Sequence, residues 1–264
     1  MVASPSIRCV LAPNPSAMTG PGTNTYLVGE SDLAVVDPGP DLPEHLRAIQ
    51  AAAQGGRIAA ILVTHRHNDH LPAARPLASL CGAPIYGHAD LPGVQQPLVD
   101  DQRLAVGNLT FVALATPGHT SESLCYLAED GRALFCGDLM AGSGTVVVGA
   151  GEHDLSLYLG SLRRLRELAP SRVLPGHGPP IEDAVARIDG YLAHRQERED
   201  QILAALSSGP KTVQTLREAI YVGLAEGLHR PAEQNVQTHL YKLHGEDRVV
   251  ELEGTWQLKA PLPL

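Results

Sequence analysis

Short apolar runs alternate with helical patterns over the first 180 residues of the chain. Residues 58–63 form a continuous apolar run of strand length, which is typical of a strand covered on both faces. Further strands, short and rich in β-branched or aromatic residues, are predicted over residues 7–11, 25–28, 33–37, 109–115, 123–127, 132–136 and 172–174. Helices are predicted from Asp41 to the Gly55-Gly56 break, over residues 72–80, and from Asp154 to Pro170. This alternation predicts an α/β fold.

The end of the chain follows a different pattern. A long helical pattern covers residues 181–206 and is broken by Ser207-Ser208-Gly209-Pro210. The elements predicted after the break are two helices and then two short strands, over residues 213–221, 231–243, 248–252 and 255–258. Helix, helix and two-stranded wing is a winged-helix-like order. We therefore expect a main domain over residues 1–200 and a small winged-helix-like domain over residues 201–264.

Composition and charge narrow the class of protein. The 264 residues are 44% hydrophobic and 19% charged, which is enough to bury a full core. The balance of 20 basic against 29 acidic residues argues against a binder of duplex DNA. The sequence shows neither an apolar run long enough to cross a membrane nor a secretory leader pattern. The four cysteines form no CxxC pair, so we expect reduced thiols in a cytoplasmic protein. The sequence carries no signal for oligomeric state.

Histidine is the residue type with an unusual distribution. Three of the 12 histidines lie in Thr64-His65-Arg66-His67-Asn68-Asp69-His70, directly after the 58–63 strand. An H-x-H spacing places two imidazoles on one side of an extended segment, so both can reach one metal ion. The following Asp-His turns away and can reach a second ion close by, as in two-metal hydrolases. This segment therefore predicts a metal site at a strand end.

Three more predicted strands end in a Gly-containing turn that carries a residue able to bind metal. His119 lies in Pro117-Gly118-His119-Thr120, Asp138 follows Cys136-Gly137, and His177 lies in Pro175-Gly176-His177-Gly178. One such turn is a weak signal, since most polar residues in turns are only loop formers. Four strand ends in this order, however, indicate ligands gathered at one rim of the sheets.

These motifs together, T-H-x-H-x-D-H, G-H-T, G-D and G-H-G, resemble those of the metallo-β-lactamase superfamily. The resemblance implies an αββα sandwich, with a catalytic domain over residues 1–200 and metals at the edge between two sheets. It implies two zinc ions, although the same nitrogen-and-carboxylate set also suits iron or manganese. By motif position, the first ion falls to His65, His67 and His119, the second to Asp69, His70 and His177, and Asp138 bridges both.

The chemistry that this ligand set implies is hydrolysis by a metal-bridged hydroxide. Two divalent ions outweigh Asp69, Asp138 and the hydroxide by a net charge of about +1, and they lower the pKa of water toward ~7. They also act as Lewis acids on the oxygen where negative charge develops. The candidate for moving a proton to the leaving group is Asp69, the candidate catalytic residue, or a metal-bound water.

Three earlier residues are candidates for supporting roles. Asp37, at the end of the 33–37 strand, resembles an acidic residue that orients a ligand histidine, but an Asp before Pro-Gly is equally typical of a turn. Asn24 and Tyr26, in Pro21-Gly22-Thr23-Asn24-Thr25-Tyr26, resemble an early loop close to the metals. Both are candidate substrate contacts, with a structural turn as the alternative.

The substrate class stays open between two hydrolases. P-G-T-N-T-Y-L-V-G, P-G-H-G-P-P-I and the C-terminal pattern resemble the beta-lactamase-like protein 2 family of endoribonucleases, which implies a phosphodiesterase acting on single-stranded RNA. From residue 195 onward, however, eight basic residues face ten acidic ones, which is unfavourable for phosphate contacts. The alternative is a glyoxalase II-like thioester (hydroxyacylglutathione) or lactone hydrolase with side activity on β-lactams. A winged-helix regulator without catalysis is disfavoured because all seven ligand positions are intact. Of these two substrate classes, the motif resemblance favours single-stranded RNA by a narrow margin.

Overall fold

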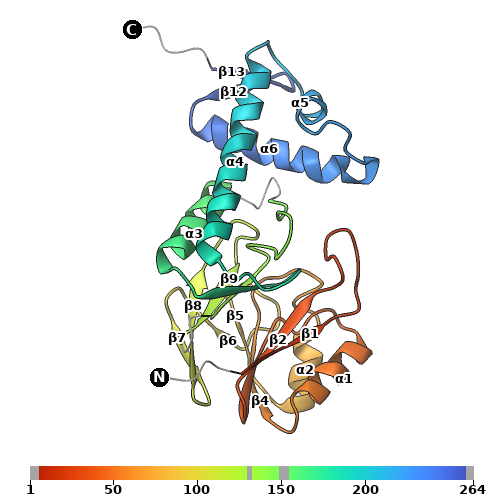
Figure 1. Cartoon of the computed structure of the whole chain (residues 1–264), viewed down its shortest axis with the longest axis vertical. Coiled ribbons are helices and arrows are strands. Elements are labelled where there is room, and N and C mark those ends of the chain that lie inside the picture. Colours follow the sequence, from red (N-terminus) through yellow and green to blue (C-terminus); the bar gives the residue numbers. More distant parts are fainter. Residues whose placement is uncertain (1–5, 130–132, 149–154, 260–264) are drawn as a thin grey trace.

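The computed structural model describes residues 6–129, 133–148 and 155–259. Two sheets face each other in the lower body of the molecule, and helices cover their outer faces (Figure 1). One sheet is built from the strands β1 (Ile7–Leu11), β2 (Asn24–Val28), β3 (Asp32–Val36), β4 (Arg57–Leu62), β5 (Ile85–Gly87) and β6 (Gln96–Pro97), in that order. Strands β3 to β6 are parallel, so their carboxyl ends share one edge.

The second sheet has the order β11-β10-β9-β8-β7. Its strands are β7 (Arg103–Val106), β8 (Leu109–Ala115), β9 (Leu124–Ala128), β10 (Ala133–Gly137) and β11 (Arg172–Pro175). Strand β9 runs antiparallel to both β8 and β10, and β10 runs parallel to β11. Strands β8, β10 and β11 therefore end at the same edge, each followed by a turn.

Three apolar clusters hold the layers together. Side chains such as Leu62 and Phe111 pack between the two sheets. The outer face of the first sheet packs against α1 (Pro43–Ala52) and α2 (Ala74–Cys81), and that of the second against α3 (Leu155–Leu168) and the start of α4 (Ala184–Leu206). The predicted αββα sandwich is thus confirmed, as is the prediction that residues 58–63 are covered on both faces, because β4 contributes to two clusters.

The C-terminal elements form a separate small core. They are α5 (Val213–Ile220), the 3-10 helix η1 (Glu226–Leu228), α6 (His229–Gly245), β12 (Val249–Leu252) and β13 (Thr255–Leu258). Trp256, only 1% exposed, lies at the centre with Leu216, Val236 and Leu240. This helix–helix–wing order confirms the winged-helix prediction. Figure 1 shows α4 running from the sandwich to this domain, so the predicted division between residues 200 and 201 falls inside a continuous helix and stays a prediction.

The sequence pattern misplaced some elements and missed others. No strand was predicted at β5, β6 or β7, which are short and partly exposed. Helix α4 begins at Ala184, three residues after the predicted start at 181. Helix α6 begins at His229, two residues before the predicted start at 231. The predicted helix start at Asp154 lies outside the described residues, within which the helix runs from Leu155. Among the described residues, no helix combines the length and apolarity that a membrane crossing requires.

Candidate metal centre

The predicted ligands all come from turns at the carboxyl ends of strands. The segment from His65 to His70 follows β4, His119 follows β8, Asp138 follows β10 and His177 follows β11. Because β4 belongs to one sheet and the other three strands to the second, the seven side chains meet at the shared edge of the sandwich. The structure thus brings every predicted metal-binding residue to one place.

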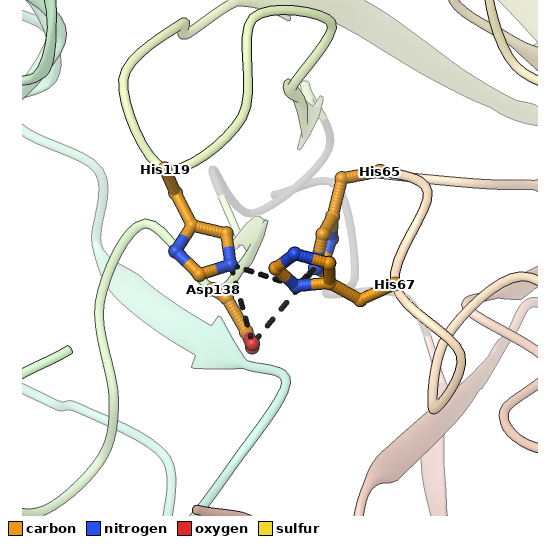
Figure 2. A group of neighbouring side chains, drawn as sticks. All are labelled: His65, His67, His119 and Asp138. Atoms are coloured by element: carbon orange, nitrogen blue, oxygen red, sulfur yellow. Dashed lines mark hydrogen bonds and ion pairs between the residues drawn. The ribbon is translucent and has the colours of Figure 1, made fainter. Parts of the chain in front are cut away.

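The first group of donor atoms contains His65, His67, His119 and Asp138 (Figure 2). Nδ1 of His67 lies 3.0 Å from Nε2 of both His65 and His119. Oδ2 of Asp138 lies 3.8 Å from His65 Nε2 and 3.7 Å from His119 Nε2. One donor atom from each of the four lies within 4.8 Å of every other, so a single ion can be reached by all of them.

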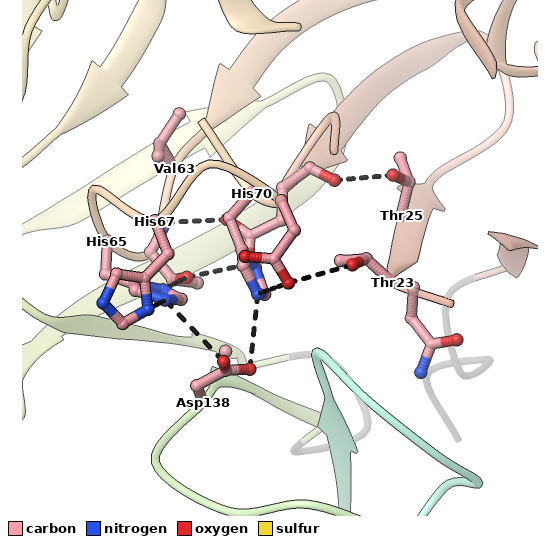
Figure 3. A network of polar contacts seen from close by, with 12 residues as sticks. Thr23, Thr25, Val63, His65, His67, His70 and Asp138 are labelled. Carbon is pink, nitrogen blue, oxygen red and sulfur yellow. Dashed lines mark hydrogen bonds and ion pairs between the residues drawn. The ribbon is translucent and has the colours of Figure 1, made fainter. Parts of the chain in front are cut away.

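The second group contains Asp69, His70, His177 and again Asp138. His177 Nε2 lies 3.1 Å from Asp69 Oδ2 and 3.3 Å from Asp138 Oδ2. His70 Nε2 faces Asp138 Oδ1 at 3.3 Å (Figure 3). Asp138 is the one member common to both groups: its Oδ1 faces His70, and its Oδ2 lies within 3.8 Å of His65, His119 and His177. A carboxylate in this position can reach an ion held by either group.

Outer contacts fix the orientation of the imidazoles. Nδ1 of His70, the ring nitrogen that faces away from the donor group, lies 2.8 Å from Asp37 Oδ2. Nδ1 of His65 lies 2.9 Å from the Thr64 hydroxyl. Thr64 itself donates to Asp37 through its backbone N–H and its hydroxyl, at 2.8 and 2.7 Å. Of the two interpretations of Asp37, the structure supports the orienting role: this carboxylate holds ligand histidines of both groups, directly or through Thr64.

The protonation pattern suits metal binding. Burial lowers the pKa of His119 to about 4 and holds that of His65 well below its usual range, so both are neutral bases at neutral pH. Burial opposes charge on His177, but hydrogen bonds to Asp138 and Asp69 outweigh it and raise the pKa to about 9. Burial also opposes charge on Asp69, yet the hydrogen bond from His177 lowers its pKa to about 2. The carboxylates thus attract positive charge that metal ions can supply, with release of protons.

Buried polar atoms and local shape support the same fit. His70 Nε2 and Asp138 Oδ1 are buried and have no hydrogen-bond partner; they lie 3.3 Å from each other, and a metal ion would engage both. Residue 176 must be glycine, because a Cβ there would lie 2.5 Å from His70 and 2.6 Å from Asp138. The donor set of imidazoles and carboxylates matches zinc, iron or manganese. The residues present therefore fit a metal centre.

The contact between Asp37 and His70 gives a first test of this centre. Asp37→Asn keeps the shape but removes the charge that orients His70, so we expect metal affinity to fall about 10- to 100-fold. Competition with a chromophoric chelator measures this affinity. Asp90→Asn is the matched control, since the side chain of Asp90 is 74% exposed and belongs to neither donor group. Equal metal affinity in both variants would show that Asp37 does not support the site.

Asn24 and Tyr26 are both buried, which favours the structural alternative over a contact with substrate. Asn24 donates its side-chain N–H groups to the carbonyls of Pro175 and Gly178, at 3.0 and 2.9 Å. The Tyr26 hydroxyl donates to the Pro175 carbonyl at 2.8 Å. Neither side chain is among those that line the cavity at the metal-binding residues. Both instead fasten β2 to the turn that carries His177.

Two supporting residues were missed by the sequence analysis. Glu122, 1% exposed, accepts hydrogen bonds from the backbone and guanidinium of Arg66 and so anchors the loop that carries His65 and His67. Thr23 donates its hydroxyl to Asp69 Oδ2 at 3.1 Å. Neither residue belongs to a donor group, and both contact a loop that is distant from them in sequence. A sequence motif gives no signal for such contacts.

A cavity of about 330 Å³ opens onto both donor groups. His119, Asp138 and His177 line it, together with the loop of residues 17–21, the loop of residues 143–147, and Leu228 and Pro231 of the C-terminal domain. The segment Ser143-Gly144-Thr145 therefore lies beside the site. A larger hollow of about 740 Å³ beside α2 shares no residue with either donor group, so size alone does not identify the site.

Comparisons with known proteins agree with this architecture. Residues 18–177 match the sequence profile described as the metallo-beta-lactamase superfamily, and residues 212–256 match that of the beta-lactamase associated winged helix domain. A metallo-beta-lactamase family protein of Thermus thermophilus has a similar crystal structure, with a TM-score of 0.81 and 24% sequence identity. That alignment covers 96% of this chain and 98% of the other.

Two curated relatives are similar in sequence. The Drosophila melanogaster protein named beta-lactamase-like protein 2 homolog is 32% identical over 266 residues, covering 92% of this chain and 89% of that protein. The Aspergillus fumigatus protein named atrochrysone carboxyl ACP thioesterase is 35% identical over 226 residues, covering 83% of this chain and 70% of that protein. Similarity to the first includes most of the C-terminal domain as well as the sandwich.

Proposed function

The chain belongs to the metallo-β-lactamase superfamily, and from this premise we propose that it is a metal-dependent hydrolase of thioesters or esters with an apolar acyl group. The observation that carries the proposal is the lining of the 330 Å³ cavity. Among the described residues that line it there is neither lysine nor arginine, while Met18, Pro21, Val146 and Leu228 supply apolar surface. An uncharged carbonyl substrate with an apolar group suits these walls.

His65, His67 and His119 would hold one metal ion and Asp69, His70 and His177 the other, with Asp138 between them. Bound divalent ions supply Lewis acidity, which activates water near neutral pH and polarises the carbonyl. In hydrolysis the water oxygen bonds to the acyl carbon, the carbon–sulfur or carbon–oxygen bond breaks, and a proton reaches the leaving group. Asp69 is the proposed carrier of that proton, because its side chain is 25% exposed against 12% for Asp138, and Thr23 holds its Oδ2 in place.

Single-stranded RNA is the second candidate substrate. It is favoured by similarity to the beta-lactamase-like protein 2 homolog along 92% of the chain, the winged-helix domain included. Against it stands the missing cationic surface among the described residues of the cavity, since affinity for RNA depends on phosphate contacts from lysine and arginine. The name of the Aspergillus fumigatus thioesterase adds weight to the acyl substrate.

A substrate panel tests the proposal. Zinc-loaded protein is assayed on acyl thioesters of N-acetylcysteamine, S-lactoylglutathione, a lactone, nitrocefin and a single-stranded RNA. We expect turnover of acyl thioesters or the lactone and intact RNA. Cleaved RNA with intact thioesters would overturn the proposal in favour of the second candidate. In that case the few cations at the site predict a shallow slope of log activity against log salt, about −1 to −2.

A further inference from the structure

A second cavity of about 230 Å³ adjoins the one at the metal-binding residues. The two share the lining residues Thr145, Val146, Val147, Leu228 and Pro231, so they lie on either side of a common wall. One part of this wall comes from the loop of residues 145–147 of the catalytic domain, and the other from the end of η1 and the first turn of α6 in the winged-helix domain. The second cavity therefore borders the active-site space on the side of the winged-helix domain.

The far side of the second cavity is supplied mainly by the winged-helix domain. Tyr221, Leu224, Ala232 and Asn235 line it there, and His194 of α4 completes it. Most of these side chains are apolar or aromatic, and Arg198 holds the Tyr221 ring in place, with its guanidinium carbon 4.2 Å from the ring centroid. Among the described residues that line it, none is lysine, arginine, aspartate or glutamate. An apolar group of a ligand can thus pack against Tyr221, Leu224 and Ala232, while the buried Asn235 Oδ1 and His194 Nδ1, which have no hydrogen-bond partner, are left for a polar atom or a water.

The common wall is fixed to the metal-binding residues. Arg195 is fully buried and donates from Nη2 to the Val146 carbonyl at 2.7 Å. The next carbonyl, that of Val147, lies 3.3 Å from Nδ1 of His119. These contacts set the position of the wall relative to the first donor group. The second cavity therefore has a fixed position relative to the first donor group. A pocket that selects substrates by the length of their acyl chain requires such a fixed distance.

We propose that the second cavity binds the distal part of the substrate's acyl chain and that Leu224 and Ala232 limit the length of chain accepted. This inference rests on the proposed thioester or ester hydrolysis and assigns a purpose to the winged-helix domain, which closes the chain-binding cavity. The substrate class that follows is an acyl thioester or ester whose chain is long enough to reach the second cavity. Burial of each added methylene favours binding by about 0.8 kcal/mol, about fourfold, until the cavity is full.

Filling the cavity tests the inference. Zinc-loaded wild type is compared with Leu224→Trp and Ala232→Phe on acetyl, butyryl and octanoyl thioesters of N-acetylcysteamine. We expect kcat/KM in the wild type to rise from acetyl to octanoyl. Both variants should lose about 10- to 50-fold on octanoyl while keeping wild-type values on acetyl. Leu252→Trp and Ala204→Phe are the matched controls, since both residues are exposed and line neither cavity.

Binding of the product acid separates this inference from the proposed function. Calorimetry with the same zinc-loaded proteins compares octanoate with acetate, and it does not depend on turnover. We expect octanoate to bind wild type at least about tenfold more tightly than acetate, and this preference to vanish in both cavity-filling variants but not in the controls. Absence of the preference in wild type, or its survival in both folded cavity-filling variants, would overturn the inference. Octanoate preference without hydrolysis of any thioester or ester would instead refute the proposed function alone.

Discussion

Replacing Asp138 with alanine is expected to abolish turnover while leaving the fold intact. Asp138 is the only residue common to the two donor groups; its Oδ1 faces His70, and its Oδ2 faces His65, His119 and His177. Loss of a residue that merely orients a ligand costs about 10- to 100-fold, so removal of the bridge should cost more than about 100-fold in kcat/KM. Steady-state kinetics on the best substrate of the panel measure the loss.

Two comparisons make this result specific. Circular dichroism of Asp138→Ala should match that of the wild type, because the side chain lies at the rim of the sandwich and outside its apolar clusters. Asp90→Ala removes an exposed carboxylate outside both donor groups and should keep wild-type kinetics. Turnover by Asp138→Ala within a few-fold of wild type would refute its assignment as the bridge.

Trp256→Ala is expected to have the largest effect on stability. The indole is 1% exposed, packs in the small C-terminal core, and has Tyr241 and His244 rings at centroid distances of 5.9 Å. Truncating a buried Trp to alanine lowers the free energy of unfolding by about 3–5 kcal/mol. That is a large share of the stability that so small a core can provide. Thermal unfolding followed by circular dichroism measures the loss. Because Leu228 and Pro231 line the active-site cavity, KM should also rise.

Tyr241→Ala is the control for this variant. It removes an aromatic ring that also contacts Trp256 but is itself 50% exposed, so the destabilisation should be much smaller. If Trp256→Ala unfolded within about 1 kcal/mol of the wild type, the C-terminal elements would not form the core described above.

The parts of the fold that the sequence predicts are those with strong local patterns. Strands β4 and β8 appear as apolar or β-branched runs of sufficient length, and their bounds agree with the prediction to within a residue. Strand β5 has three residues and β6 has two, and such short segments hold their conformation only through neighbouring strands. Pairing with residues distant in sequence, rather than local propensity, forms these edges.

The candidate site likewise contains residues that a local sequence pattern predicts and residues that only the tertiary structure brings together. Residues such as His65, His67 and His70 are predictable because a dense group of imidazoles has few purposes other than metal binding. The contacts of Glu122 with Arg66 and of Thr23 with Asp69 join residues 56 and 46 positions apart, and no local pattern encodes them. Leu228 and Pro231 reach the cavity only because α4 places the winged-helix domain beside it, an arrangement that requires the tertiary structure.

Metal content tests the central claim most directly. The protein is stripped with a chelator, reconstituted with zinc, freed of loosely bound metal and analysed by inductively coupled plasma mass spectrometry. Two donor groups that share Asp138 predict about two ions per chain, and Asp138→Ala should lower that number. A reproducible content of about one ion or fewer in the reconstituted wild type would contradict a dinuclear hydrolase.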